Sequence, residues 1–336
     1  MRKFSLALMI LILPVTLSGC WYSTNNTFGA IDPPPIEDAL VKTKMVQATQ
    51  NEQSNTVQVY LLNDAGFLVP CTTQVSGGNL PLQIMNNLVK GEQLPKGFVK
   101  LFPKGTEVKG VKISEGKATI DLSSDFEKYD AALEGKILDA ITWSLTGLAE
   151  IKEVNLSVNG KLLEVMPKGK LSAMNMTRKR GINLEVAQGV NPSQSMPVVL
   201  YFTWQAPDQQ TYHVPITRMV NESTNVAQAT LCELIRGPEL YSKLINNVDS
   251  NTELNTVEIA NGVVKADFNE QLTQYDGQKA ISQGAFDAIM LSLTENTGVS
   301  KVKITVNGTG KVPVLGQENA KDQLVSRPKY INAKAV

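Results

Sequence analysis

Residues 107–122 read EVKGVKISEGKATIDL, and residues 253–268 read ELNTVEIANGVVKADF. Each stretch contains two runs of alternating apolar and polar residues around a turn, Glu-Gly at 115–116 and Asn-Gly at 261–262. Asn-Gly between two such runs is a strong β-hairpin signal, and Glu-Gly is a weaker form of it. The alternation indicates strands with one face on a core and one face in water. We therefore predict the same hairpin twice in one chain.

The elements around the hairpin recur as well. A helical pattern between Asn79 and Gly91 returns between Asn225 and Gly237, with Asn suited to the N-cap and Gly to a left-handed C-terminal position. A longer helix follows each hairpin, and its apolar residues are four apart. These residues are Leu133, Ile137, Ile141 and Leu145 in the first copy and Ile281, Ala285, Ile289 and Leu293 in the second. Strand patterns at 57–62 and 154–158 in the first copy are matched at 198–202 and 302–306 in the second.

Each copy is thus predicted to be a small α+β domain of order β-β-α-β-β-α-β, with two helices packed on one face of a small sheet. Arg178 with Ile182-Asn183 is echoed by Arg327 with Ile331-Asn332, so each copy is expected to end in a tail packed back on its domain. The predicted segments are a first domain with its tail at 57–185, a linker at 186–196, and a second domain with its tail at 197–333.

The N-terminal residues predict export and lipid attachment. Arg2 and Lys3 precede an apolar stretch that ends in Leu-Ser-Gly-Cys at 17–20, which resembles a bacterial lipobox. We predict a lipoprotein signal peptide at 1–19, a diacylglyceryl group on Cys20, and a flexible Asn-, Thr- and Pro-containing tether at 20–56. An ordinary secretory signal with a chance Cys is the alternative. The expected location is the extracytoplasmic face of the cell membrane, through the lipid anchor.

Composition limits the possible partners. The 336 residues include 32 basic and 32 acidic side chains, so no overall field favours nucleic acid, and no nucleic-acid partner is expected.

Cys71 is expected in a strand and Cys232 in a helix, at places that do not correspond in the two copies. Two separate buried thiols are therefore favoured over a disulfide, which export would permit.

Catalytic residues are hard to assemble from this sequence. His213 is the sole histidine and has no evident supporting residue, so it is expected to be a surface or packed residue, and a Ser or Cys nucleophile would lack its usual partner. No metal or cofactor motif is present. We expect no enzyme activity, no cofactor and no metal. The carboxylates that recur are the candidates for glycoside hydrolysis, which needs two of them. They are Asp121 with Asp267, Asp130 with Asp276, and Asp139 with Asp287.

Structural roles for these carboxylates are favoured. Asp121 and Asp267 are expected at strand ends, Asp130 and Asp276 as helix N-caps, and Asp139 and Asp287 as solvated groups beside the apolar stripe. A locally basic segment is also present, and it is either a solvated linker or a contact to lipid headgroups or teichoic acid. Its cations are Lys168, Lys170, Arg178, Lys179 and Arg180.

The ordered set of these elements resembles the GerMN domain, occurring twice. The resemblance is carried by 88–91 and 234–239, by the strand 116–122, by Leu145-Thr146 and by 154–160. The second copy departs from it at 265–268. A GerMN domain is similar to the ring-building motif of oligomeric secretion rings and of the channel between mother cell and forespore, and this similarity concerns the fold.

The resemblance implies a sporulation and germination lipoprotein of endospore-forming bacteria. We expect a non-catalytic assembly protein at the mother-cell membrane that faces the intermembrane space and has protein partners in the sporulation channel complex. Direct binding or remodelling of peptidoglycan is the alternative function. A subunit of a homo-oligomeric ring is a third possibility.

Overall fold

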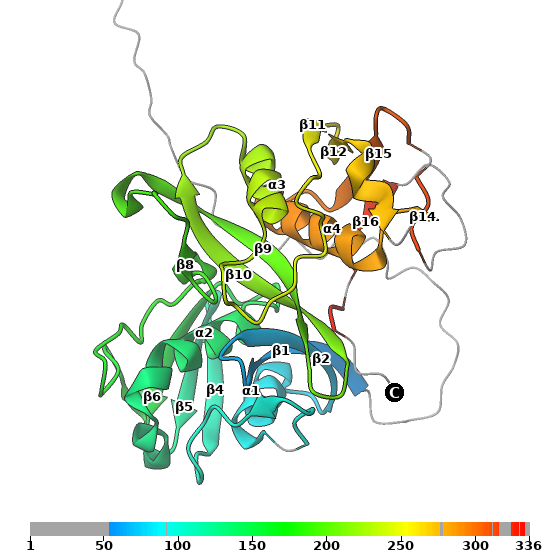
Figure 1. The fold of residues 1–336 in the computed structure, drawn as a ribbon. Helices are drawn as coiled ribbons and strands as arrows, with labels where there is room; N and C mark the ends of the chain where they lie inside the picture. Colours follow the sequence, from blue (N-terminus) through cyan, green and yellow to red (C-terminus); the bar gives the residue numbers. More distant parts are fainter. Residues whose placement is uncertain are drawn as a thin grey trace, which may run out of the picture. The chain divides into compact units, whose positions relative to one another are not determined.

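The computed structural model describes residues 54–91, 93–275, 278–310, 312–315, 324–328 and 330–332 (Figure 1). The predicted signal peptide, Cys20 and nearly all of the predicted tether lie outside the described residues.

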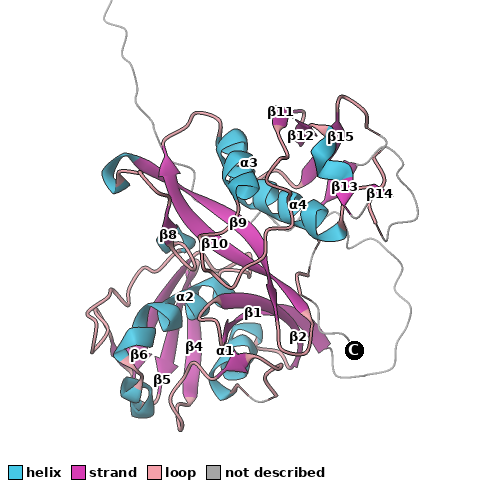
Figure 2. Cartoon of the chain, viewed as in Figure 1, coloured by secondary structure: helices cyan, strands magenta, loops and turns pink. Residues whose placement is uncertain are grey.

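The first described strand begins at Ser54, and the main elements of the first repeat follow the predicted order (Figure 2). They are β1 (Ser54–Asn63), β2 (Leu68–Ser76), α1 (Leu80–Lys90), β3 (Phe98–Val99), β4 (Val108–Ser114), β5 (Lys117–Leu122), α2 (Glu134–Leu145), β6 (Glu153–Val158), β7 (Lys161–Leu162) and β8 (Glu185–Val186).

The second repeat has its main elements in the same order, with a longer second helix. Its elements are β9 (Ser195–Gln205), β10 (Thr211–Asn221), α3 (Val226–Arg236), β11 (Leu254–Ala260), β12 (Val263–Phe268), β13 (Gln274–Tyr275), β14 (Gln278–Lys279), α4 (Gln283–Thr297), β15 (Lys301–Val306) and β16 (Leu324–Ser326). The short strands β13 and β14, before that helix, are additional to the elements of the first repeat. The predicted tandem α+β repeat is therefore confirmed.

The main strands of each repeat are divided between two sheets. In the first repeat β2-β1-β3 form one sheet and β4-β5-β6-β7 form the other. In the second repeat one sheet has the order β8-β10-β9, with β10 paired to both neighbours, and β11-β12-β15-β16 form the other sheet. The hairpin strands are antiparallel, while β5 and β12 each run parallel to the strand that follows the long helix. Both helices of a repeat contact strands of both sheets, so the core lies between the sheets.

The predicted apolar stripe fills this core. Ile137, Ile141 and Leu145 of α2 are completely buried, and Ile281, Ala285, Ile289 and Leu293 of the second repeat are at most 2% exposed. Burial of one such aliphatic side chain contributes about 1.5–3 kcal/mol, so four of them fix a helix on its sheets.

The predicted helix ends are largely confirmed. Asn79 accepts a hydrogen bond from the backbone of Leu82 at the start of α1, and Asn225 does the same for Gln228 at the start of α3. Gly91 ends α1 in the left-handed region, with φ of +52°. Gly237 ends α3 with a positive φ of +88° but an extended ψ, which turns the chain away instead of continuing the coil.

The predicted linker is not free chain throughout. β8, at the start of 186–196, pairs in parallel with β10, and β9 already begins at Ser195. The end of the first repeat is thereby joined to a strand of the second. The exact domain limits of 57–185 and 197–333 stay a prediction.

Candidate functional site

Asp121 and Asp267 fasten a turn in each repeat. Oδ1 of Asp121 accepts hydrogen bonds from Ser157 Oγ at 2.9 Å and from the backbone N–H of Gly160 at 2.7 Å. Oδ1 of Asp267 accepts the equivalent bonds from Thr305 Oγ1 at 2.5 Å and from Gly308 at 2.8 Å. Both carboxylates thus hold the Asn-Gly turn that follows the last core strand, which is a structural role.

Hydrogen bonding also sets the charge of Asp267. Burial would raise the pKa of its carboxyl, but the bonds from Thr305, Asn255 and Gly308 outweigh burial and hold the pKa below its usual value. A carboxylate held in its ionised form by three donors is well suited to clamping a turn and poorly suited to acting as a general acid.

The second pair of candidate carboxylates is Asp130 and Asp276, and only Asp130 lies among the described residues. Asp130 accepts a hydrogen bond from Ala132 and caps the short 3-10 helix Ala131–Leu133 that leads into α2. Asp276 lies outside the described residues, and the N-cap of α4 is Ser282. The prediction that an Asp caps the second long helix was therefore wrong, because a Ser directly before the helix performs that role.

The third pair is less exposed than expected. The Asp139 side chain is only 18% exposed, and its Oδ1 lies 3.4 Å from Arg180 Nε. Burial raises the pKa of Asp139 to about 6, although Arg180 opposes the shift. The counterpart Asp287 accepts a hydrogen bond from Gln283 at 2.8 Å and lies 3.5 Å from Nε2 of His213. The prediction of two solvated carboxylates was wrong because each side chain leans toward a basic group on a neighbouring element.

His213 was expected to lack support, yet the structure places it beside Asp287. Its backbone N–H donates to Oδ1 of Asn332 at 2.8 Å, and its Nδ1 is a buried atom without a hydrogen-bond partner. The imidazole belongs to a contact between β10, α4 and the C-terminal tail, and no Ser or Cys nucleophile is hydrogen-bonded to it among the bonds of the described residues.

The basic segment is only partly solvated. Arg178 is buried, Arg180 faces Asp139, and the ammonium group of Lys168 donates to the backbone carbonyl of Tyr129. Lys168, Lys170 and Lys179 are the exposed members of the set. Ion pairs or backbone carbonyls engage four of the five cations, Lys168, Lys170, Arg178 and Arg180. The prediction of a solvated basic linker is therefore wrong for the buried Arg178, whereas the three lysines are exposed.

Glu134, which sequence reasoning missed, holds this segment in place. Its carboxylate accepts hydrogen bonds from Tyr129 Oη at 2.5 Å and from the backbone N–H groups of Gly169 at 2.6 Å and Leu171 at 3.0 Å. Burial would raise the pKa of Glu134, but these bonds outweigh it and lower the pKa. Burial and the same bond raise the pKa of Tyr129 to about 12. Glu134 lies in the first turn of α2, and nothing in the sequence around it indicates that its backbone partners lie more than thirty residues later.

A buried ionic cluster joins the two repeats. Glu295, on α4 of the second repeat, lies 3.4 Å from Arg178 of the first tail and 2.5 Å from Arg327 of the second tail. Tyr201 donates to the same carboxylate at 3.1 Å. Burial would raise the pKa of Glu295, but the charges of Arg327 and Arg178 outweigh it and hold the pKa below its usual value.

Two asparagines connect the edges of β2 and β10. Asn183 exchanges two hydrogen bonds with the backbone of Leu68 and donates to the carbonyl of Pro215 at 2.9 Å. Asn332 exchanges the equivalent two with His213 and donates to the carbonyl of Pro70 at 2.8 Å. Because proline has no N–H, these strands need an added donor where they meet. The predicted tails therefore pack on both repeats, not only on their own.

The two cysteines differ in exposure. Cys71 is buried and Cys232 is exposed, so the thiols are separate but the prediction that both are buried was wrong. In the described ranges no three His, Cys, Asp or Glu side chains come together as a metal site, and no helix there is long and apolar enough to cross a membrane.

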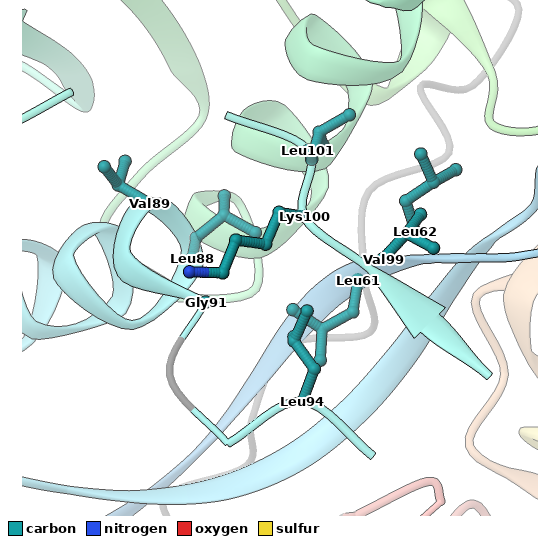
Figure 3. A pocket seen from close by; sticks show the side chains of 9 residues that line it. All are labelled: Leu61, Leu62, Leu88, Val89, Gly91, Leu94, Val99, Lys100 and Leu101. Atoms are coloured by element: carbon teal, nitrogen blue, oxygen red, sulfur yellow. The ribbon is translucent and has the colours of Figure 1, made fainter. Parts of the chain in front are cut away.

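A small apolar pocket lies between β1, the end of α1 and β3 (Figure 3). Its walls include Leu61, Leu88 and Leu94.

Comparison with known proteins gives a consistent result. The model of the Germane family, described as sporulation and spore germination, matches residues 58–164 and 199–311. The chain is 31% identical over 347 residues to the spore germination protein GerM of Bacillus subtilis (strain 168), and the alignment covers 94% of each chain. It is also similar to the solved structure of the tandem GerMN domains of the sporulation protein GerM from Bacillus subtilis. That match has a TM-score of 0.75 and 30% identity, and it covers 84% of this chain and 99% of the other.

Proposed function

Because this chain belongs to the Germane family of sporulation and spore germination proteins, we propose that it acts in sporulation as a membrane-anchored, non-catalytic assembly protein and is needed for normal germination. Its role in sporulation and germination is supported by similarity over nearly the whole chain. The assembly role is argued from how the two repeats are joined.

The observation that carries the proposal is the polar connection between the repeats. Glu295 forms ion pairs with arginines of both tails. Asn183 and Asn332 each form hydrogen bonds with backbone groups of both repeats. Buried polar contacts are costly when one partner is removed, so they favour one arrangement of the pair. Two linked modules that keep one arrangement can engage a shared target together, which raises the effective concentration of the second contact.

Each repeat also offers a free strand edge. β4 and β11 are terminal strands in their sheets, and each carries an exposed isoleucine at the equivalent position. Ile113 is 41% exposed and Ile259 is 50% exposed. An edge strand has unpaired backbone groups and can accept an added strand from a partner. We propose these edges as contacts for protein components of the channel between mother cell and forespore.

The predicted lipid anchor completes this function. With a diacylglyceryl group on Cys20, the two repeats would be held at the extracytoplasmic face of the membrane, in the space between mother cell and forespore. Fractionation of cells that produce the wild type and Cys20→Ala tests the anchor. The wild type is expected in the membrane fraction and the variant in the soluble fraction, and equal distribution of the two would contradict the anchor.

The assembly role is tested by complementation and crosslinking in Bacillus subtilis that lacks GerM. The chain is expected to restore sporulation and germination, and a photocrosslinking amino acid at Ile113 or Ile259 is expected to capture envelope or channel proteins. Leu184 is the matched control, because it is 60% exposed and lies outside both edge strands. Capture at Leu184 equal to capture at both isoleucines would contradict the proposed edges.

Direct action on peptidoglycan is the outcome that would replace this proposal. A cell-wall pull-down and a zymogram of the purified chain decide it. Wall binding without crosslinked protein partners would favour a peptidoglycan-binding protein. Clearing of the wall that Asp121→Asn or Asp267→Asn abolishes, while both variants remain folded, would make it an enzyme.

A further inference from the structure

The loop that follows α3 displays two large apolar side chains. Leu240 is 88% exposed and Tyr241 is 102% exposed, more than any other large apolar residue of the described chain. Their exposed neighbours, Glu239 and Lys243, carry opposite charges. The apolar surface of the loop is therefore greatest at its tip, and Ile245 near the end of the loop is less exposed, at 45%.

The tip is a tight turn with an unusual residue in it. The N–H of Ser242 donates to the carbonyl of Glu239 at 3.1 Å, which places Leu240 and Tyr241 at the two central positions. Tyr241 has a φ of +66°, a conformation that disfavours residues with a Cβ and is normally taken by Gly or Asn. The strain at this position is therefore retained together with an exposed aromatic ring, which points to a function for the ring.

The corresponding loop of the first repeat forms its turn with a different residue at the position of positive φ. In this turn Phe98 N–H donates to Pro95, and Gly97 occupies the position of positive φ, at +82°. Leu94 of that loop lies against the pocket that Leu61 and Leu88 line (Figure 3). The first loop thus turns Leu94 toward the pocket and has glycine at the positive-φ position of its turn, whereas the second loop has Tyr241 at that position and leaves Leu240 exposed.

Both ends of the second loop are fastened. Arg218, which is buried against Glu185 and Glu233, donates to the carbonyl of Gly237 at 2.9 Å. At the other end, Ile245 exchanges two backbone hydrogen bonds with Thr203 of β9. Because both ends of the loop are held in place, its tip stays exposed and does not fold back onto the domain.

We propose that the Leu240–Tyr241 turn inserts into the interfacial region of a lipid bilayer, as a second and weaker attachment beside the anchor at Cys20. A tip of two residues is far smaller than the surface of roughly 800 Å² per partner that a stable protein interface needs. Tyrosine suits the boundary between acyl chains and headgroups, because its ring is apolar and its hydroxyl is polar. The inference rests on the proposed membrane location, since a tethered domain meets the bilayer often enough for a weak contact to be populated.

Charge determines what kind of membrane contact this is. Glu239 and Lys243 offset each other next to the tip, and Arg236 is already paired with Glu233 at 2.6 Å. The contact is therefore an apolar insertion, and it should depend little on anionic lipid or on salt.

Vesicle fluorescence tests the insertion without the natural anchor. Residues 20–336 with an N-terminal hexahistidine tag are held on phosphatidylethanolamine–phosphatidylcholine vesicles that contain a nickel-chelating lipid. An environment-sensitive fluorescent amino acid at position 241 is expected to shift to the blue and to be quenched by brominated lipid. The same label at Leu184, 60% exposed, should show neither change. Leu240→Ser should reduce the inserted-to-free ratio at position 241 by about tenfold.

Tyr241→Gly separates a binding role from a structural one. Glycine accepts the positive φ without strain, so this variant should unfold at higher urea than the wild type. It should also lose the quenching by brominated lipid of a label placed at position 240. Lower stability of Tyr241→Gly would overturn the argument from strain.

Three other results would overturn the proposal: no blue shift at 241 on vesicles, an equal shift at 184, or a shift that appears only with anionic lipid and disappears in salt. Recovery of a protein crosslinked at 241, without lipid contact, would assign the tip to a protein partner instead. Because the tag replaces the lipid on Cys20, failure here is distinct from failure of the anchor, which the Cys20→Ala fractionation reports.

Discussion

Arg178 and Arg327 occupy equivalent positions in the two tails and bind one shared carboxylate, that of Glu295. Arg178 also donates to Thr146 and to the carbonyl of Trp143 in the last turn of α2, and Arg327 donates to Thr294 and to the carbonyl of Leu291 within α4. Two cations thus face one anion, and the carbonyl end of α2 supplies further negative potential beside Arg178. The hydroxyl and carbonyl contacts of the two arginines correspond between the repeats, whereas the single carboxylate of Glu295 serves both arginines.

Glu295→Gln is expected to destabilise the protein strongly. The variant keeps the shape of the side chain but leaves two buried guanidinium groups without their counter-ion, and loss of one partner of a buried pair costs about 3–5 kcal/mol. Urea unfolding at pH 7 measures the change in the free energy of unfolding. Glu239→Gln is the matched control, because Glu239 is exposed and the same exchange there should have little effect.

The same residue predicts a pH dependence. Because the pKa of Glu295 is lower in the folded than in the unfolded state, its contribution to stability is complete above the unfolded value of about 4.3 and is lost as the pH falls through the folded value. The stability of the wild type should therefore fall more steeply below about pH 4.3 than that of Glu295→Gln. Parallel profiles of the two proteins would show that the carboxyl is not ionised in the cluster.

Replacing Asn183 or Asn332 tests the connection between β2 and β10. Asn183→Gly retains the positive φ of +47° but loses all three backbone contacts, whereas Asn183→Ala also introduces strain. Leaving buried backbone groups without partners costs about 1–3 kcal/mol for each group. We expect Asn183→Gly to lower the free energy of unfolding by at least about 2 kcal/mol, Asn183→Ala by more, and the exposed control Asn221→Ala by little. A neutral Asn183→Gly would contradict the role of the side chain.

Local patterns in the sequence predicted most of the fold. Alternation around 115–116 and 261–262 predicted both hairpins, and the four-residue spacing of Ile137, Ile141 and Leu145 predicted the buried face of α2. These signals are readable because each depends on neighbours within one element. The tails were also found, because Arg178 and Asn183 recur as Arg327 and Asn332.

Long-range polar partners could not be predicted in the same way. Glu134 binds a loop more than thirty residues later, and Glu295 binds arginines of both tails. Nothing in the sequence near either glutamate indicates which backbone or cation will approach it. Internal repetition gave no help with Glu295, because it lies in a contact between copies that are otherwise alike. The exposed Tyr241 was missed because a positive φ at a non-glycine residue has no sequence signal.

Asp139→Asn is expected to stabilise the protein at neutral pH. Burial raises the pKa of Asp139 to about 6, so the folded state retains a proton that the unfolded state releases near pH 3.9. Stability contributed by this group is therefore present at low pH and declines as the pH rises from about 4 to about 6. The variant should be more stable than the wild type by about 1–2 kcal/mol at pH 7, after the lost contact with Arg180 is included, and not more stable at pH 4. A loss of stability at pH 7 would show that the pair with Arg180 outweighs burial.

Gly97→Ala probes the contact between the first repeat and β9. A Cβ at Gly97 would lie 2.7 Å from the ring of Trp204 and 2.7 Å from Pro207, and Phe98 packs edge-on to Trp204 with ring centroids 5.4 Å apart. Gly66 is the matched control, since its φ of +86° is nearly that of Gly97, +82°, but nothing lies within 4 Å of its Cβ position. Both alanine variants carry about 1 kcal/mol of backbone strain, and overpacking should add about 1–3 kcal/mol at Gly97 alone. Urea unfolding followed by tryptophan fluorescence measures both, and equal destabilisation would show that the ring of Trp204 moves away from the loop without cost.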